Sequence, residues 1–330
     1  MNKVLIIGPN YFGYTKSIAK AFVNLGWNTE TVDFDNPVHP FKGINKIRFK
    51  LTSDKDSFKL ENRKNWQPII CSKFDSIKPD LVFVLNGDML LTDTLDYFRT
   101  NGAKVIIWMY DNINRFPHCV DNIGHCDIFA CFDKEDAARV GGVFLPQACD
   151  ATTYYKIPGC TKDIDILFVG LCWGYKARKE LLAKVIERYQ STRKIEIYGI
   201  WSYFSKDPIG CLTRPYKHII HNHSISTETV NQLYNRAKLV INILHEEQKN
   251  GANPKVFEIS RSGAYQICTK NEYIASVYPN GEIGLFETEQ ELFDLIDLAL
   301  KNGNDGNESY RIVSENHTFE KRIFFILNKL

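Results

Sequence analysis

The fold is decided by residues 163–189, which read DIDILFVGLCWGYKARKELLAKVIERY. The apolar run at the start of this stretch ends in a glycine and predicts a buried β-strand. The part RKELLAKVIERY predicts a helix, which a short loop separates from the strand. A buried strand followed by a helix is the unit from which parallel sheets with two covered faces are built. The stretch therefore predicts an α/β protein.

The same unit recurs on both sides of this stretch. Earlier in the chain, buried strands are predicted in KVLIIG (3–8), WNTETVDF (27–34), DLVFVLNGD (80–88), AKVIIWMYDN (103–112) and CDIFACFD (126–133). Later in the chain, they are predicted in KIEIYGI (194–200), KLVINIL (238–244) and AYQICT (264–269). Two successive series of similar size predict two Rossmann-like, doubly wound domains that face a cleft, where small ligands usually bind.

The division of the chain follows from these series. We place an N-terminal domain at residues 1–152 and a second domain at residues 160–312. The segment TYYKIPG, residues 153–159, contains proline and glycine and is interpreted as a linker. Residues 313–330 are predicted to form a C-terminal helix that packs back on the first domain.

Composition excludes several classes of protein. The chain has 330 residues, of which 44% are apolar, and a formal net charge of +2. This charge gives no argument for a nucleic-acid partner, and no apolar run is long enough to span a membrane. The nine cysteines show no pairing pattern, so we expect them to be reduced. The expected location is the cytoplasm, with the inner face of the membrane as the peripheral alternative.

Two His–Cys pairs, His118–Cys119 and His125–Cys126, contain residue types that zinc accepts. Their spacing matches no common zinc module, and adjacent side chains point apart on a helix or a strand. We therefore expect no metal site and no cofactor.

Residues 41–66 are unusually basic. They contain eight cations and three acids, which gives a local charge of +5. The cations are Lys42, Lys46, Arg48, Lys50, Lys55, Lys59, Arg63 and Lys64. Aromatic residues are interleaved with them. One interpretation is a docking surface for an anionic membrane or a polyanionic acceptor. The other, which the sequence favours, is a solvated excursion from the first domain.

The stretch NPKVFEISRSGAY, which begins at Asn253, predicts a short helix with an unusual placement of charge. Asn253 suits the N-cap and Pro254 suits the first helical position. The free amide groups at a helix start favour an anion, and Lys255 adds positive charge there. Glu258 lies one turn further along the same side, where a carboxylate can accept two hydrogen bonds from the diol of a ribose. A surface ion pair between Lys255 and Glu258 is the alternative that this spacing leaves open.

Further candidate residues follow predicted strands, because ligands of parallel sheets bind beyond the carboxyl ends of the strands. Gly170 would let a ligand approach the backbone, and Arg178 offers a forked set of donors to phosphate oxygens. In the first domain, the strand ends carry residues 8–13, 86–88 and 111–114.

Several stretches occur in an order typical of one family. They are ILFVG with a following arginine, IYG before a tryptophan, LYNRAKLVINI, NPKVFEISRSGAYQICT and HTFEKRI, together with WMYDN in the first half. In these stretches the chain resembles the spore-maturation (CgeB-like) glycosyltransferases, group 1 transferases with the GT-B fold. The family usually has arginine at the position of Lys255. Broader relatives have an E-x7-E pair whose first acid corresponds to Asn250 here.

The resemblance implies a nucleotide-sugar donor, with a UDP-sugar favoured, bound mainly by the second domain. It implies that Glu258 holds the ribose and that Lys255 and Arg178 face the diphosphate. The donor-nucleotide site would further include Gly170, Tyr198, Gly199, His223 and Asn253. Asp111 would act in catalysis together with Lys255 and Arg178. The acceptor site would contain Asn10, Gly13, Asn86, Asp88 and Asn112.

The resemblance thus predicts a glycosyltransferase that acts with retention of configuration and without a metal ion. Its acceptor would be a cell-surface glycan, a lipid-linked sugar or a protein. Three alternatives stay open: a nucleotide-sugar epimerase of the same architecture, a non-catalytic sugar-nucleotide or glycan-binding protein, and a nicotinamide oxidoreductase. For the last of these, the stretch GPNYFGY lacks the G-x-G-x-x-G spacing of a dinucleotide site.

Overall fold

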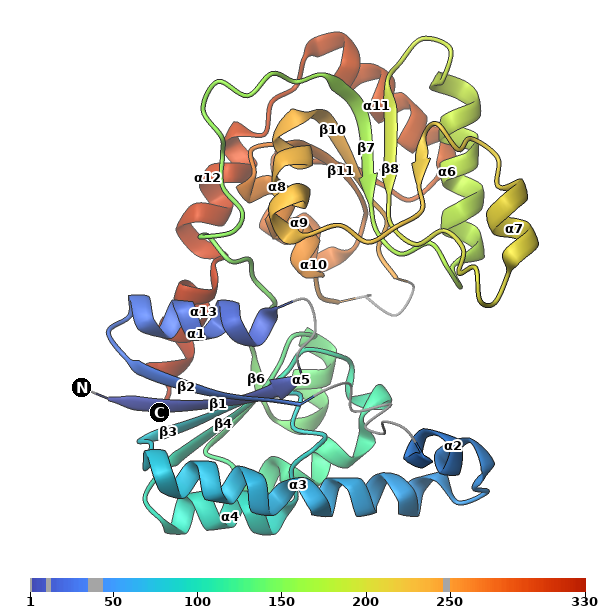
Figure 1. Cartoon of the computed structure of the whole chain (residues 1–330). Helices are drawn as coiled ribbons and strands as arrows, with labels where there is room; N and C mark the ends of the chain where they lie inside the picture. Colours follow the sequence, from blue (N-terminus) through green and yellow to red (C-terminus); the bar gives the residue numbers. More distant parts are fainter. Residues whose placement is uncertain (1, 10–12, 35–43, 246–249) are drawn as a thin grey trace. The chain divides into compact units, whose positions relative to one another are not determined.

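The chain forms two compact α/β units, seen in a computed structural model that describes residues 2–9, 13–34, 44–245 and 250–330 (Figure 1). Unit 1 comprises Met1–Gln147 and Phe319–Leu330, and unit 2 comprises Ala148–Thr318. Each unit contains a six-stranded sheet in which the paired strands run parallel. The predicted fold class of two Rossmann-like domains is confirmed.

The sheet of unit 1 has the order β2-β1-β3-β4-β5-β6. Its strands are β1 (Lys3–Pro9), β2 (Asn28–Phe34), β3 (Leu81–Leu85), β4 (Lys104–Met109), β5 (Ile128–Cys131) and β6 (Val143–Phe144). Its α-helices are α1 (Tyr14–Asn24), α2 (Ile44–Leu51), α3 (Lys55–Ile77), α4 (Thr92–Thr100), α5 (Lys134–Val140) and α13 (Phe319–Leu327). Two 3₁₀ helices, η1 (Ile113–Arg115) and η2 (Pro117–His125), follow β4. The central strand β3 is buried at every residue, as expected for a strand covered on both faces.

The sheet of unit 2 has the order β12-β11-β10-β7-β8-β9. Its strands are β7 (Ile164–Val169), β8 (Ile195–Tyr198), β9 (Ile220–His221), β10 (Ala237–Asn242), β11 (Tyr265–Thr269) and β12 (Gly284–Phe286). Its helices are α6 (Lys176–Tyr189), α7 (Pro208–Thr213), α8 (Thr227–Arg236), α9 (Pro254–Arg261), α10 (Glu272–Val277), α11 (Glu289–Asn302) and α12 (Asn307–Asn316). Local sequence starts several of them: the Thr288 hydroxyl and Glu291 form a capping box at α11.

The sheet of unit 2 is covered on both faces by separate apolar clusters. On one face, buried side chains of α8, α9 and α10 pack together, and Tyr234 and Phe257 are among the largest. On the other face, α6 and α11 contribute Ile186, Tyr189 and Ile296. Strand β7 therefore leads to a helix on one face, and β10 leads to a helix on the other. The connection reverses direction between these two neighbouring strands.

The boundaries of the units differ from the expected ranges. The segment 153–159 is not a linker, because Tyr154 is buried in the core of unit 2. The backbone amides of Tyr155 and Ile157 also donate to the side chains of Asn231 and Asn235 on α8. The expected helix at 313–330 is divided: α12 belongs to unit 2, whereas α13 belongs to unit 1.

Two general expectations can be compared with the structure. All nine cysteines are present as free thiols, and six of them are buried. None of the helices described combines the length and the hydropathy needed to cross a membrane.

Candidate functional site

The start of α9 in unit 2 has the predicted cap. The side chain of Asn253 accepts a hydrogen bond from the Val256 amide at 3.2 Å, and Pro254 occupies the first turn. The helix begins after β10, at the carboxyl edge of the sheet. Lys255 and Glu258 do not form an ion pair on the surface. The Lys255 amino group donates to the Val169 carbonyl at 2.7 Å, and Glu258 is only 6% exposed. The surface-pair alternative is therefore wrong.

Burial acts on both charged groups of this helix. It raises the pKa of the Glu258 carboxyl, an effect that the nearby Lys255 and a hydrogen bond from Tyr154 oppose. Burial lowers the pKa of the Lys255 amine, and Glu258 opposes this shift. Each group thus favours the charged form of the other, although both are withdrawn from water. Two partly compensated charges beside a helix start form a site that a ligand could complete.

Two glycines let the backbone segments that follow β7 and β8 approach each other beside the Lys255 side chain. A Cβ atom on Gly170 would lie 2.9 Å from the Lys255 amino nitrogen. Gly199 has a φ of 132°, and a Cβ atom there would lie 2.0 Å from the Gly170 carbonyl oxygen. Only glycine fits at position 199, because a Cβ atom there would overlap the backbone of Gly170. Gly170, Gly199 and Lys255, which are all expected in the donor-nucleotide site, thus lie near one another.

An aromatic pair lies at the next strand ends. The rings of Tyr198, on β8, and His221, on β9, stack at 4.2 Å with an interplanar angle of 17°. His223 meets the Tyr198 ring edge-on at 6.2 Å, and the His221 ring also contacts the carboxylate of Glu196. These rings could receive a planar base, and Tyr198 and His223 are both among the residues expected in the donor-nucleotide site.

Arg178 joins the two central strands of unit 2 from the first turn of α6. Its guanidinium donates to the carbonyl of Leu171, after β7, at 2.6 Å and to that of Ile243, after β10, at 2.8 Å. It also lies over the Tyr175 ring at 4.6 Å. Its Nε atom is buried without a hydrogen-bond partner among the residues that the structure describes. The cation is thus fixed at the point where the chain reverses direction between β7 and β10.

This point is a recognised ligand position in open α/β sheets. If β7 is counted as the first strand of unit 2, the sheet order reads 3-2-1-4-5-6. Sheets of this order bind nucleotides outside the carboxyl ends of the strands, where the order reverses. Lys255 and Arg178 both lie at this switch point. Tertiary structure therefore brings together the two cations that the sequence separates by more than seventy residues.

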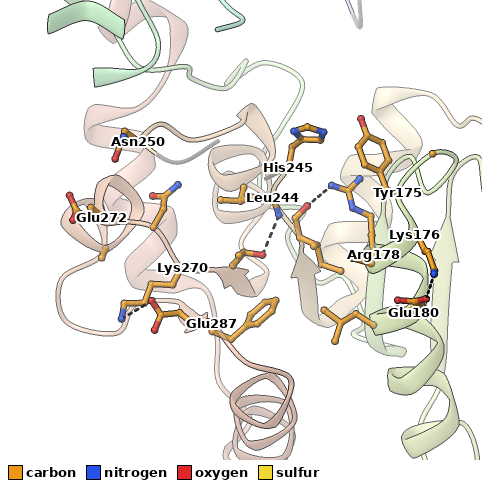
Figure 2. Close-up of a pocket in the computed structure, with 18 residues that line it drawn as sticks. Tyr175, Lys176, Arg178, Glu180, Leu244, His245, Asn250, Lys270, Glu272 and Glu287 are labelled. Atoms are coloured by element: carbon orange, nitrogen blue, oxygen red, sulfur yellow. Dashed lines mark hydrogen bonds and ion pairs between the residues drawn. The ribbon is translucent and has the colours of Figure 1, made fainter. Parts of the chain in front are cut away.

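A pocket of about 1290 Å³ extends from Arg178 along the carboxyl ends of β10, β11 and β12 (Figure 2). Figure 2 shows Arg178, Tyr175 and His245 on one side of it, with Lys270 and Glu287 on another. The Tyr175 and His245 rings meet at 5.2 Å, and Lys270 pairs with Glu287 at 3.5 Å.

Sequence reasoning missed most of this pocket. Only Arg178 had been assigned a role, and Asn250 had been noted as a departure from the family pattern. The available signal was the polar stretch HEEQKNGAN between β10 and α9, which is long for a strand–helix connection. Residues 246–249 of this stretch lie outside the part of the chain that the structure describes.

Unit 1 carries a different set of polar groups after β3 and β4. The Asn86 amide donates to Asp111 at 3.2 Å, and Arg115 donates to the other Asp111 oxygen at 2.8 Å. Asn86 has a φ of 64°, which asparagine tolerates better than most residues, and its Oδ1 accepts from the Tyr110 amide. The predicted neighbours Asn86 and Asp111 are thus in direct contact.

Asp88 belongs to the same cluster. Burial raises the pKa of its carboxyl to about 6, and repulsion from Asp111 adds to this shift, whereas Arg63 opposes it. One Asp88 oxygen and the Arg63 Nε are buried without a hydrogen-bond partner within the described part of the chain. The cluster therefore retains unused hydrogen-bonding capacity.

The remaining acceptor-site predictions have mixed outcomes. Asn112 is engaged with Asp136 of α5 at 3.4 Å, apart from the Asp111 contacts. Gly13 is the N-cap of α1, with a φ of 74° and open space around it. Asn10 lies outside the described residues. Asp111 belongs to unit 1, whereas Arg178 and Lys255 belong to unit 2.

The residues that the structure describes contain no group of three or more His, Cys, Asp or Glu side chains arranged to hold a metal ion. The two His–Cys pairs are separated by other contacts: Cys119 donates to the Asn86 carbonyl, and His125 pairs with Asp96.

Comparison with known proteins agrees with this geometry. Residues 178–328 match the model of a family described as glycosyl transferase-like, and the match begins at Arg178 and covers most of unit 2. No curated protein sequence shows significant similarity to the chain.

Solved structures resemble the chain over its whole length. Sucrose-phosphate synthase (tll1590) from Thermosynechococcus elongatus has a TM-score of 0.68 at 11% identity, with 99% of this chain and 98% of that chain covered. The trehalose-6-phosphate structure from E. coli bound with UDP-2-fluoro glucose has a TM-score of 0.68 at 10% identity, with 99% and 98% covered. The lipopolysaccharide outer core galactosyltransferase WaaB has a TM-score of 0.61 at 14% identity, with 99% and 100% covered.

At these identities, the structural likeness establishes the fold, which is GT-B. The family match and this fold together support a group 1 glycosyltransferase, and the predicted enzyme class is confirmed. Neither comparison distinguishes the CgeB-like branch from other branches, so that resemblance stays a prediction.

Proposed function

We propose that unit 2 binds a nucleotide-sugar, with a UDP-sugar favoured, and that the enzyme transfers the sugar to a hydroxyl group of a glycan, lipid-linked or protein acceptor. The observation that carries the proposal is the position of Lys255 and Arg178 at the switch point of the unit 2 sheet. Two cations and the free amides at the start of α9 lie at the edge where such sheets bind phosphates.

The order of the strands in the unit 2 sheet suggests how the nucleotide-sugar would lie along the carboxyl edge. Along the carboxyl edge, the Tyr198–His221 pair lies at β8 and β9, Lys255 contacts β7, and the pocket begins at β10. Neighbouring strands are roughly 4.8 Å apart, so β8 and β11 are separated by about 14 Å. We assign the base to the aromatic pair, the ribose to Glu258, the diphosphate to Lys255 and Arg178, and the sugar to the pocket.

The chemistry requires a stabilised leaving group more than a protein nucleophile. The bond between the sugar and the diphosphate breaks, a bond to the acceptor oxygen forms, and the proton of the acceptor hydroxyl passes to the departing diphosphate. Lys255, Arg178 and the amides of α9 would stabilise the negative charge that develops on the diphosphate. We propose that this occurs with retention and without a metal ion, because protein cations here would take the role that a metal has elsewhere.

Unit 1 supplies groups suited to an acceptor. The Asp111 carboxylate is oriented by Asn86 and Arg115 and has lone pairs left to accept a bond from a sugar hydroxyl. Asp88 adds a second carboxyl group nearby. Arg115 and Arg63 partly offset these two carboxyl groups, so the cluster offers hydrogen-bond acceptors without a net positive charge, which suits hydroxyl groups better than phosphates.

Calorimetry tests the donor assignment. UDP, GDP, dTDP and NADH are titrated into the wild type and into Glu258→Ala, and each variant is first checked for a cooperative thermal transition. We expect one nucleoside diphosphate to bind the wild type and to bind the variant at least tenfold more weakly. Equal affinity of the two proteins would disprove the role of Glu258, and exclusive binding of NADH would favour an oxidoreductase.

A turnover assay separates the remaining alternatives. The bound nucleotide selects a series of nucleotide-sugars, which are incubated with and without acceptor extracts. Acceptor-dependent release of nucleoside diphosphate supports transfer. Conversion of the sugar without an acceptor would indicate an epimerase, and binding without turnover would indicate a non-catalytic protein.

A further inference from the structure

The basic segment of unit 1 forms a projecting helical hairpin. Helix α2 and the first part of α3, residues 44–62, extend beyond the edge of the unit 1 sheet (Figure 1). Contacts with the core begin further along α3, where Arg63 donates to the Leu90 carbonyl and Ile70 and Phe74 are buried. Hydrogen bonds at the α2–α3 turn, such as that from the Ser57 amide to Asp54, are local. We call residues 44–62 the basic hairpin.

The basic hairpin exposes aliphatic side chains. Ile47 and Leu51 lie one turn apart on α2 and are 59% and 80% exposed, and Leu60 on α3 is 39% exposed. Phe49 and Phe58 pack against each other at 5.8 Å and join the two helices. The aromatic residues thus hold the hairpin together, while aliphatic residues face solvent. A segment that only contacts water gains no stability from exposed aliphatic side chains, so this arrangement indicates a binding surface.

Positive charge surrounds these aliphatic side chains. Residues 47–66 contain six cations and three acids. Lys59 pairs with Asp56, whereas Arg48, Lys50, Lys55 and Lys64 form no ion pair with any residue that the structure describes. Cations that flank exposed aliphatic residues on short helices are typical of segments that lie in the interface of an anionic bilayer. A soluble polyanion would use the charges and leave Ile47 and Leu51 without a function.

We propose that the basic hairpin docks unit 1 on an anionic lipid surface, with Ile47 and Leu51 inserted among the headgroups and the cations above them. This function is independent of the donor site in unit 2. The exposure of the aliphatic residues favours the docking interpretation of segment 41–66, whose residues 41–43 lie outside the part of the chain that the structure describes. The sequence shows the charges but not this exposure. The lipid surface would restrict the enzyme to acceptors near a membrane.

Vesicle cosedimentation tests this proposal on the full chain. Vesicles of neutral phosphatidylcholine, alone or mixed with anionic phosphatidylglycerol, are combined with the protein in low and high salt. We expect binding to the anionic vesicles only, weakened strongly by salt. The triple variant Arg48→Gln, Lys50→Gln, Lys55→Gln should bind on the order of 100-fold more weakly, about fivefold per cation.

A matched pair of variants tests the aliphatic contribution. Ile47→Ser with Leu51→Ser should lower vesicle binding at least about tenfold. The control is Ile209→Ser with Leu212→Ser on α7 of unit 2, where the two side chains are similarly exposed, at 72% and 64%. The control should bind vesicles like the wild type. Loss of binding in the control alone would overturn the proposal.

Two further outcomes would also overturn it. If the wild type binds neutral and anionic vesicles equally, charge does not direct the docking. If dextran sulfate binds the hairpin and vesicles do not, the partner is a soluble polyanion. Calorimetry with the nucleotide found for the wild type shows that the hairpin variants retain a folded unit 2, so failure of docking and failure of the proposed transfer are distinguishable.

Discussion

The carboxyl edges of the two sheets carry different polar groups. Unit 2 has two cations, which we call the cationic edge, and unit 1 has two carboxyl groups, which we call the acidic edge, although Arg63 and Arg115 partly offset its charge. In unit 2, the switch point between β7 and β10 carries Lys255 and Arg178. In unit 1, the end of β3 and the end of β4 carry Asp88 and Asp111. Both sheets are parallel and six-stranded, but their strand orders differ: with the first strand of each unit counted as 1, unit 1 reads 2-1-3-4-5-6 and unit 2 reads 3-2-1-4-5-6. In unit 1 the order reverses between β1 and β3, so Asp88 follows a strand at the switch point and Asp111 follows the next strand. Under the proposed function, strand order and side chains together separate the edge assigned to the diphosphate from the edge assigned to acceptor hydroxyl groups.

The largest expected effect concerns the cationic edge. Arg178→Ala should weaken binding of the nucleoside diphosphate by about 3 kcal/mol, roughly 100-fold or more, because it removes a charge-assisted donor from the switch point. Calorimetry at low salt measures this change. Arg178→Lys keeps the charge without the fork and should give an intermediate affinity.

The matched control for Arg178 is Lys179→Ala. Lys179 is the next residue on α6, but its amine lies over the Trp173 and Trp201 rings rather than at the switch point. The control should keep wild-type affinity within about twofold, since a lone surface cation contributes little. If both variants lose affinity equally, general positive charge rather than the switch point binds the diphosphate.

The acidic edge predicts a dependence of stability on pH. Burial raises the pKa of Asp88 to about 6 in the folded protein, so the folded state holds this proton where the unfolded chain has lost it. The stability that the protonated carboxyl contributes is present below about pH 4 and is lost as pH rises through 6. Asp88→Asn should therefore raise the free energy of unfolding at pH 7.5 relative to wild type by about 2 kcal/mol.

Urea unfolding of both proteins at pH 5 and pH 7.5 checks this prediction. The difference between Asp88→Asn and wild type should be smaller at pH 5. A difference that does not change with pH would show that the Asp88 carboxyl titrates normally, and the acidic edge would then be more solvated than its burial implies.

Glu258 sharpens the comparison within unit 2, because it is an acid on the cationic edge. Glu258→Gln keeps the shape of the side chain and removes the charge. It should weaken UDP about tenfold, or about 1.4 kcal/mol, and should weaken 2′,3′-dideoxy-UDP little, since the diol is the group that the carboxylate holds. Equal losses for both nucleotides would place Glu258 in support of Lys255 instead of on the ribose.

The smallest expected effect concerns Asp111. Asp111→Asn should lower kcat/KM for transfer to the acceptor by roughly fivefold, the value of one hydrogen bond of about 1 kcal/mol. The Kd for UDP should stay unchanged, because the nucleotide is assigned to unit 2. A change in nucleotide affinity without a change in transfer would contradict the division of roles between the two edges.

Local sequence patterns gave reliable predictions where a residue type has one dominant structural preference. Asn253 and Pro254 predicted the start of α9, and the cap is present. Apolar runs predicted the strands because a strand buried on both faces has no polar positions. The linker prediction at 153–159 was wrong for the opposite reason: proline and glycine mark a break in regular structure, but they do not show that the chain leaves the core.

Contacts between residues that are far apart in the sequence could not be predicted from local patterns. A spacing of three residues could not show that Glu258 is buried or that Lys255 turns to the Val169 carbonyl. Most of the pocket along β10 to β12 was not predicted, because its lining comes from the ends of different strands and from helices far apart in the sequence. The exposure of Ile47 and Leu51 was also invisible, since hydrophobic residues in a helix are usually buried.

By itself, the sequence determined the two α/β series, the helix cap at Asn253 and the residues able to bind phosphate, because these depend on local periodicity and side-chain chemistry. Tertiary structure alone decided that Arg178 and Lys255 meet at one switch point, that Glu258 is removed from water, and that the basic hairpin presents aliphatic residues to solvent. The physical reason is that strand order and burial arise from contacts between distant segments, and no local pattern encodes them.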